Sequence, residues 1–142
     1  MQFQILTLFQ ELIEPYVNGS ILGKAQEKGL IDIQFFNWRT YADNKHNSVD
    51  DKPYGGGAGM LLQVKPIYKQ LQDLNYKSAH VVMMDPSGKQ FTHEDAKRLA
   101  NKDRLIILSG RYEGFDARVD EFVDEKISIG PYVLAGGELP AL

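Results

Sequence analysis

Two short runs of this chain are apolar without interruption. Residues 81–84 read Val-Val-Met-Met and residues 105–108 read Leu-Ile-Ile-Leu. A strand with one face in water alternates apolar and polar side chains, whereas a strand buried on both faces stays apolar throughout. Two such runs predict an α/β fold with a mostly parallel sheet flanked by helices.

The remaining segments alternate between strand and helix patterns, as this fold requires. Further strands are predicted at 2–9, 31–35 and 126–129, and helices at 21–28 and 66–74. A turn is predicted at 85–88, and Thr92 with Asp95 forms a capping box that begins another helix. Phe115, Val119 and Phe122 recur at helical spacing, so this segment should pack one face on the sheet. The stretch 37–59 is the least regular, and a structureless loop of this length is usually functional or disordered.

The composition excludes several classes of protein. With 142 residues the chain is predicted to form one domain, and without cysteine it has no disulfide, thiolate zinc site or cysteine nucleophile. No run approaches the roughly 20 apolar residues that span a bilayer, and the N-terminus reads as a strand, so we predict a cytoplasmic protein without membrane contact. The net charge of −3 argues against electrostatic binding of nucleic acid over the whole surface of the chain. The isolated histidines suggest no metal site, and we assign none.

The segment 54–59, Tyr-Gly-Gly-Gly-Ala-Gly, is dense in glycine but is not a dinucleotide fingerprint. The G-x-G-x-x-G spacing would need glycine where Met60 stands, and no strand precedes it. The glycines could let main-chain groups approach a ligand closely, or they could form a mobile surface loop. The composition leaves both interpretations open.

The strongest candidate site follows the strand at 105–108. That strand ends in a glycine-bearing turn, and the strand at 126–129 ends in another, Gly130-Pro131 through Gly136-Gly137. Ligands of α/β sheets bind at the carboxyl ends of strands. Arg111, Tyr112, Glu113 and Asp116 place charge directly after a buried strand, which indicates binding or, alternatively, a salt-bridged strand end.

Four segments carry a resemblance to a known family. They are DDKPYGGGAGM (50–60), DPSGKQFTHEDAKRLA (85–100), LSGRYEGFDARV (108–119) and DEKISIGPYVLAGGELPAL (124–142), and the N-terminal MQFQILTLF also fits. With them the sequence resembles the bacterial tRNA (guanine-N1)-methyltransferases of the TrmD type, in the SPOUT class of trefoil-knotted methyltransferases. The resemblance spans almost the whole chain.

The resemblance implies that loops 84–88, 109–114 and 128–137 hold S-adenosylmethionine in a bent shape, mostly through main-chain groups. The cofactor-binding residues it implies are Pro86, Gly88, Gly110, Tyr112, Gly114, Ser128, Ile129, Gly130, Tyr132, Val133, Leu134, Gly136 and Gly137. Glu113 matches a glutamate near the target base. The substrate-binding residues implied are Asp50, Tyr54, Gly55, Gly56, Gly57, Gly59 and Arg111. The product would be 1-methylguanosine immediately 3′ of the tRNA anticodon.

Two residues depart from the family pattern: Asp85 stands where serine is usual, and Pro131 where aspartate is usual. The resemblance also implies that the general base, the knot-threading helix and the C-terminal tRNA-binding domain lie beyond Leu142. We therefore expect residues 1–142 to be a SPOUT-type S-adenosylmethionine-binding domain with an incomplete knot. We expect it to bind the cofactor weakly and not to methylate tRNA alone. The complete protein is expected to be a homodimer.

The implied chemistry fits the residues. A sulfonium methyl donor needs no metal, but guanine N1 becomes nucleophilic only as its proton leaves, which requires a general base and stabilisation of charge on O6. The target base must be unstacked, and Tyr54 or Tyr112 could support it. One alternative is a non-catalytic nucleotide- or RNA-binding module of the same fold. A dinucleotide-dependent oxidoreductase is disfavoured, because the fingerprint is missing.

Overall fold

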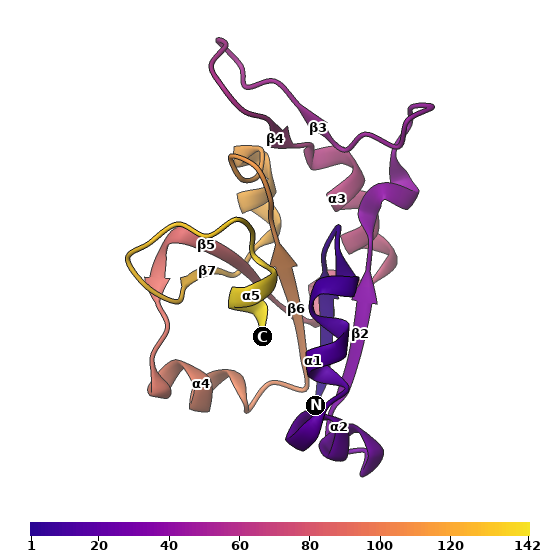
Figure 1. Ribbon diagram of the computed structural model, residues 1–142, viewed down its shortest axis with the longest axis vertical. Coiled ribbons are helices and arrows are strands. Elements are labelled where there is room, and N and C mark those ends of the chain that lie inside the picture. Colours follow the sequence, from indigo (N-terminus) through magenta and orange to yellow (C-terminus); the bar gives the residue numbers. More distant parts are fainter.

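A five-stranded sheet forms the centre of the computed structural model, which describes residues 1–142 (Figure 1). The strand order is β2-β1-β6-β5-β7, and every neighbouring pair is parallel. The strands are β1 (Gln2–Leu6), β2 (Asp32–Phe36), β5 (His80–Gln90), β6 (Arg104–Ser109) and β7 (Glu125–Ser128). The predicted parallel α/β sheet is confirmed.

Short helices connect and cover the strands. The α-helices are α1 (Glu14–Val17), α2 (Ser20–Glu27), α3 (Val64–Asp73), α4 (His93–Leu99) and α5 (Glu138–Ala141). The 3-10 helices are η1 (Gln10–Leu12), η2 (Trp38–Tyr41), η3 (Tyr76–Ser78) and η4 (Ala117–Phe122). The predicted capping box at the start of α4 is confirmed, with Thr92 and Asp95 bonding each other's main chain. None of these helices combines the length and apolar character that crossing a bilayer demands.

Both faces of the sheet carry apolar core, as the two uninterrupted runs predicted. On one face Val81 and Met83 of β5 pack with Ile106 and Leu108 of β6 and with α3. The opposite face has Val82 of β5 and a smaller cluster that includes α4. The segment 115–123 packs on the first face through its buried Val119, but its helical part is 3-10 in geometry.

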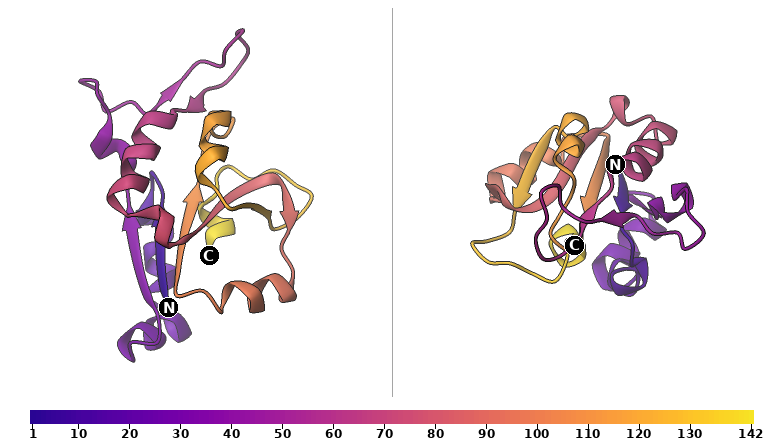
Figure 2. Two further views of the ribbon diagram at one scale, coloured as in Figure 1. Left: turned by 180° about the vertical axis from the view of Figure 1, so that it is seen from behind. Right: turned by 90° about the horizontal axis from the view of Figure 1, so that it is seen from above.

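Two segments differ in local structure from the simple pattern of the sequence. The stretch 37–59 is not structureless: Trp38 and Val49 are fully buried, and β3 (Asp50–Asp51) pairs antiparallel with β4 (Leu61–Leu62). This ribbon projects beyond the carboxyl ends of the central strands (Figures 1 and 2). The predicted turn at 85–88 lies within the bounds of β5, but these residues leave the pairing with β7, because Met84 and Lys89 both pair with Ile127. Two-residue strands and an irregular strand leave no periodic signal.

Candidate functional site

The two glycine-bearing corners predicted to form the site lie in contact. The Gly137 amide donates a hydrogen bond of 2.8 Å to the Gly110 carbonyl, and Arg111 and Gly136 form an isolated antiparallel bridge. A methyl group on Gly137 would lie 2.8 Å from the Gly110 nitrogen, so only glycine permits this approach. The corner after β6 and the end of the loop after β7 therefore form one wall.

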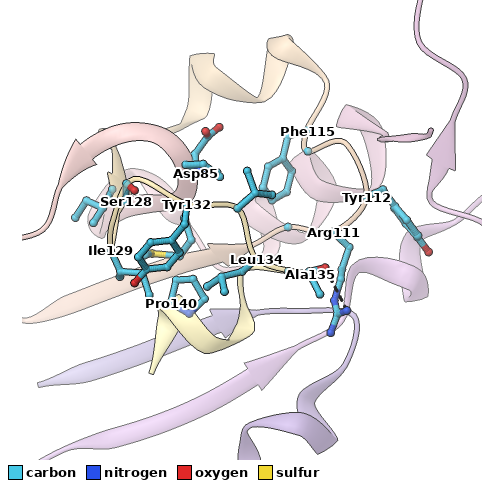
Figure 3. A pocket seen from close by; sticks show the side chains of 18 of the residues that line it. Asp85, Arg111, Tyr112, Phe115, Ser128, Ile129, Tyr132, Leu134, Ala135 and Pro140 are labelled. Carbon is cyan, nitrogen blue, oxygen red and sulfur yellow. Dashed lines mark hydrogen bonds between the residues drawn. The ribbon is translucent and has the colours of Figure 1, made fainter. Parts of the chain in front are cut away.

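A cavity of about 210 Å³ opens beside this wall (Figure 3). Its 20 lining residues are 84–86, 110–115, 127–130, 132–137 and Pro140. The predicted cofactor-binding residues that line it are Pro86, Gly110, Tyr112, Gly114, Ser128, Ile129, Gly130, Tyr132, Val133, Leu134, Gly136 and Gly137. Pockets for drug-sized ligands have volumes of roughly 300–1,000 Å³, so this cavity suits one part of such a ligand, for example a nucleoside.

The loop after β7 contains main-chain amides without a partner in the chain, in residues that line this cavity. The amides of Ile129, Val133 and Leu134 donate no hydrogen bond within the chain. The turn itself is fixed by Ser128, whose hydroxyl donates to the Gly130 carbonyl at 2.8 Å. The Tyr132 ring lies so close to Gly130 that a methyl group there would overlap it. A polar, uncharged ligand such as a nucleobase could accept from these amides, since unpaired amides favour a partner.

Glu113 is the free acidic group on the β6 side of the cavity. Its side chain is exposed and has no ion-pair partner, while its amide donates to the Met60 carbonyl at 3.0 Å. Asp116, two residues past Gly114, bonds Arg118 instead, and this arginine holds the pKa of Asp116 below its ordinary value. Tyr112 adopts the left-handed region at φ 60° and points away from Tyr132 in Figure 3. Such backbone strain is typical of functional sites.

The predicted substrate-binding residues lie mostly outside the cavity. Asp50 is in β3, and Tyr54 is 89% exposed at the tip of the ribbon. Gly55, Gly56 and Gly57 have positive φ angles and open space around them. Of the four glycines, only Gly59 lies against a residue of the cavity, because a methyl group there would overlap the Glu113 side chain.

Gly88 and Arg111 have structural contacts of their own. Gly88 does not line the cavity; a methyl group on it would lie 2.6 Å from the Lys126 carbonyl carbon, so the close packing of β5 on β7 requires glycine. Arg111 lines the cavity, but its guanidinium binds Glu138 at 3.0 Å and stacks on the Phe9 ring at 4.7 Å. Their predicted contacts with ligands remain predictions.

Sequence reasoning missed several residues of the site. The cavity also contains Met84, Phe115, Ile127, Ala135 and Pro140, and Glu138 lies buried behind it. Glu138 was visible only as part of the GGELPAL segment. An acidic residue in the first turn of a short helix is ordinarily exposed, so no local pattern indicates its burial.

A parallel sheet of this order, with a cavity lined by the corners after β6 and β7 and by the irregular part of β5, has the SPOUT type of methyltransferase fold. The chain belongs to the tRNA (Guanine-1)-methyltransferase TrmD family, whose profile matches residues 1–142. The structure is similar to the crystal structure of tRNA (m1G37) methyltransferase from Aquifex aeolicus, with a TM-score of 0.90 at 36% identity over 99% of this chain and 65% of that one.

Curated relatives match the whole chain. The sequence is 47% identical to the tRNA (guanine-N(1)-)-methyltransferase of Bacillus subtilis, over 100% of this chain and 60% of the relative. It is 49% identical to the protein of the same name in Streptococcus pneumoniae, over 100% of this chain and 59% of the relative. The chain thus spans about three-fifths of the length of these relatives.

Proposed function

We propose that the chain is the S-adenosylmethionine-binding domain of a cytoplasmic enzyme that methylates N1 of the guanosine 3′ of the tRNA anticodon. The observation that carries the proposal is the cavity between the joined corners, with the unpaired amides of Ile129, Val133 and Leu134 on its rim. The names of the relatives and of the similar structure support the substrate. The active enzyme is proposed to be a homodimer that includes a tRNA-binding domain.

The cofactor would be held mostly by main-chain groups. The corner after β7 has no charged side chain between Ser128 and Gly137, so the amides and carbonyls are its polar groups. These amides suit an adenine ring, whose ring nitrogens accept hydrogen bonds. The exposed Val133 and the Leu134 side chain offer apolar contact. When bound, S-adenosylmethionine supplies an electrophilic methyl group.

The reaction requires a proton to leave guanine N1 as the N1–carbon bond forms and the sulfur–carbon bond breaks. The proton goes to a general base, which must lie within hydrogen-bond reach of N1. Glu113, at the cavity rim, is proposed to contact the target base. Asp116 is paired with Arg118, and Asp50 of β3 does not line the cavity, so neither is proposed as the base. We propose that the base lies outside these 142 residues.

The glycine ribbon is proposed to meet the incoming tRNA. Its exposed Tyr54 offers an aromatic face to an unstacked base. At the other end of the ribbon, Met60 follows Gly59 and accepts a hydrogen bond from the Glu113 amide. RNA that is read in single-stranded loops is commonly held by such stacking. The ribbon would therefore connect recognition of the anticodon loop to the cavity.

Isothermal titration of residues 1–142 tests the cofactor assignment. Both ligands carry adenine, but we expect S-adenosylhomocysteine to bind in preference to ATP, because the chain has no phosphate-binding loop for the triphosphate. Equal binding of ATP would instead indicate a general nucleotide-binding module.

Methyl transfer from labelled S-adenosylmethionine to an anticodon stem-loop tests the position of the base. We expect no turnover by residues 1–142, and turnover would mean that Glu113 or another residue of this chain is the general base. Glu113→Gln should leave the affinity for S-adenosylhomocysteine unchanged, since its role is assigned to the target base. A stem-loop with adenosine in place of the guanosine is the control.

A further inference from the structure

A buried ion pair lies directly behind the cavity wall. Glu138 is 4% exposed, and its carboxylate accepts hydrogen bonds from Arg111 Nε at 3.1 Å and from the Thr7 hydroxyl at 3.1 Å. The Arg111 guanidinium also donates to the Ala135 carbonyl at 3.3 Å. The guanidinium carbon of Arg111 lies over the Phe9 ring, 4.7 Å from the ring centre.

This cluster joins three parts of the chain that are far apart in sequence. Thr7 and Phe9 follow β1, Arg111 follows β6, and Glu138 begins α5. Figure 3 shows Arg111 extending from the β6 corner to Ala135, which lies in the loop that carries the unpaired amides. The contact between Gly137 and Gly110 is the main-chain counterpart of the same junction.

We propose that Arg111 and Glu138 are positioning residues that hold the segment 132–137 against the Gly110 corner and so orient its amides toward the cofactor. Arg111 then acts through the main chain of Ala135 and through Glu138, and it does not contact the substrate. The inference rests on the proposed function of the cavity as the cofactor site.

Because the Glu138 carboxylate is buried, loss of the ion pair should displace the segment 132–137. The Glu138 carboxylate is almost fully buried, so removal of Arg111 leaves a charge with little access to water, whereas removal of Glu138 frees the partly buried Arg111 guanidinium from its partner. The charge regains contact with water when the segment 132–137 moves away from the β6 corner. If the cofactor binds only molecules in which this segment is held against the β6 corner, its apparent affinity is the intrinsic affinity multiplied by the fraction of such molecules.

Three variants test the proposal: Glu138→Gln, Arg111→Gln and the double variant. A glutamine at 111 has its amide nitrogen as many bonds from the main chain as arginine Nε, which is the atom that bonds Glu138. Each single variant should bind S-adenosylhomocysteine about tenfold more weakly, because the ion pair that holds the segment 132–137 is lost. The double variant replaces the ion pair with two uncharged amides and should bind better than either single variant.

Arg98→Gln is the matched control. Arg98 forms a partly buried ion pair with Glu125 at 2.7 Å, outside the cavity, so its loss should lower the melting temperature and leave the affinity unchanged. Equal losses of affinity in Arg98→Gln and Glu138→Gln would overturn the positioning role, because the effect would then be one of general stability. Unchanged affinity in both single variants would also overturn it.

Amide exchange separates failure of this inference from failure of the proposed function. The Gly137 amide is bonded to Gly110 without any ligand, and Glu138→Gln should make it exchange faster while the amides of β6 stay protected. If the unaltered chain binds no S-adenosylhomocysteine, the proposed function is wrong, whatever the exchange data show. If Gly137 exchanges at the same rate in Glu138→Gln, the pair does not hold the segment.

Discussion

Gly137→Ala probes the contact between the two corners with a single methyl group. Gly137 has φ −82°, which alanine adopts freely, so the main chain itself tolerates the change. The new methyl group would lie 2.8 Å from both the Gly110 nitrogen and the Ser109 Cα, well inside the 3.4 Å of ordinary van der Waals contact. Both atoms belong to the main chain of the neighbouring corner, so no side-chain rotation relieves the overlap.

The expected cost follows from these distances. Overpacking of this kind costs about 1–3 kcal/mol, and the reduced entropy of the unfolded chain offsets about 0.4–1 kcal/mol. A net loss of roughly 1–2 kcal/mol corresponds to a fall of roughly 3–7 °C in melting temperature for a chain of this size. Because the corners can separate only by widening the cavity wall, the dissociation constant of S-adenosylhomocysteine should rise by about tenfold, equivalent to about 1.4 kcal/mol.

Gly19→Ala is the matched control for this substitution. Gly19 also has a negative φ, −96°, and the nearest atoms to its added methyl group are 3.5 Å away, far from the cavity. Alanine is a weaker N-cap than glycine, so a loss of less than about 1 kcal/mol is expected. Calorimetric melting and isothermal titration measure both quantities. An affinity for S-adenosylhomocysteine in Gly137→Ala equal to that in Gly19→Ala would refute the reasoning.

Three further predictions concern stability. Ile106→Ala, in the fully buried centre of β6, should lower the free energy of unfolding by about 2–5 kcal/mol in urea titrations. Ile21→Ala, at a 79% exposed position, should change it by less than about 0.5 kcal/mol. Similar values for the two variants would mean that Ile106 is not part of a packed core. Thr92→Ala removes the capping box of α4 and should cost about 1 kcal/mol in the same assay, and no change would mean that the cap is not formed. The Arg98 guanidinium holds the pKa of Glu125 below its ordinary 4.5, so the stability that this carboxylate contributes is present above pH 4.5 and is lost as the pH falls through the lowered pKa. Arg98→Gln should therefore make the decline in stability below pH 4.5 less steep, and an equally steep decline would exclude the ion pair as its cause.

The sheet was predictable because its signal is local. The runs at 81–84 and 105–108 needed no knowledge of distant residues to indicate strands buried on both faces, and they are the paired strands β5 and β6. The Thr92 capping box is also a pattern within four residues. The carboxyl ends of parallel strands share one edge, so the meeting of the two glycine corners followed from the topology.

The parts that sequence reasoning missed depend on long-range contacts. Glu138 is buried because it meets Thr7, 131 positions earlier, and Arg111, 27 positions earlier. Nothing near Glu138 indicates those partners. Likewise, Trp38 is buried because the irregular stretch around it folds back on α3, and the two-residue strands β3 and β4 are too short to show alternation.

A crystal structure of the chain with S-adenosylhomocysteine would show directly where the cofactor binds. We expect density for the ligand in the cavity between the Gly110 corner and the 128–137 loop. The adenine should lie within hydrogen-bond distance of the Ile129 or Leu134 amide, and the hydrogen bond between Gly137 and Gly110 should be intact. Density at another site, or a bound ligand with those two corners apart, would contradict this expectation.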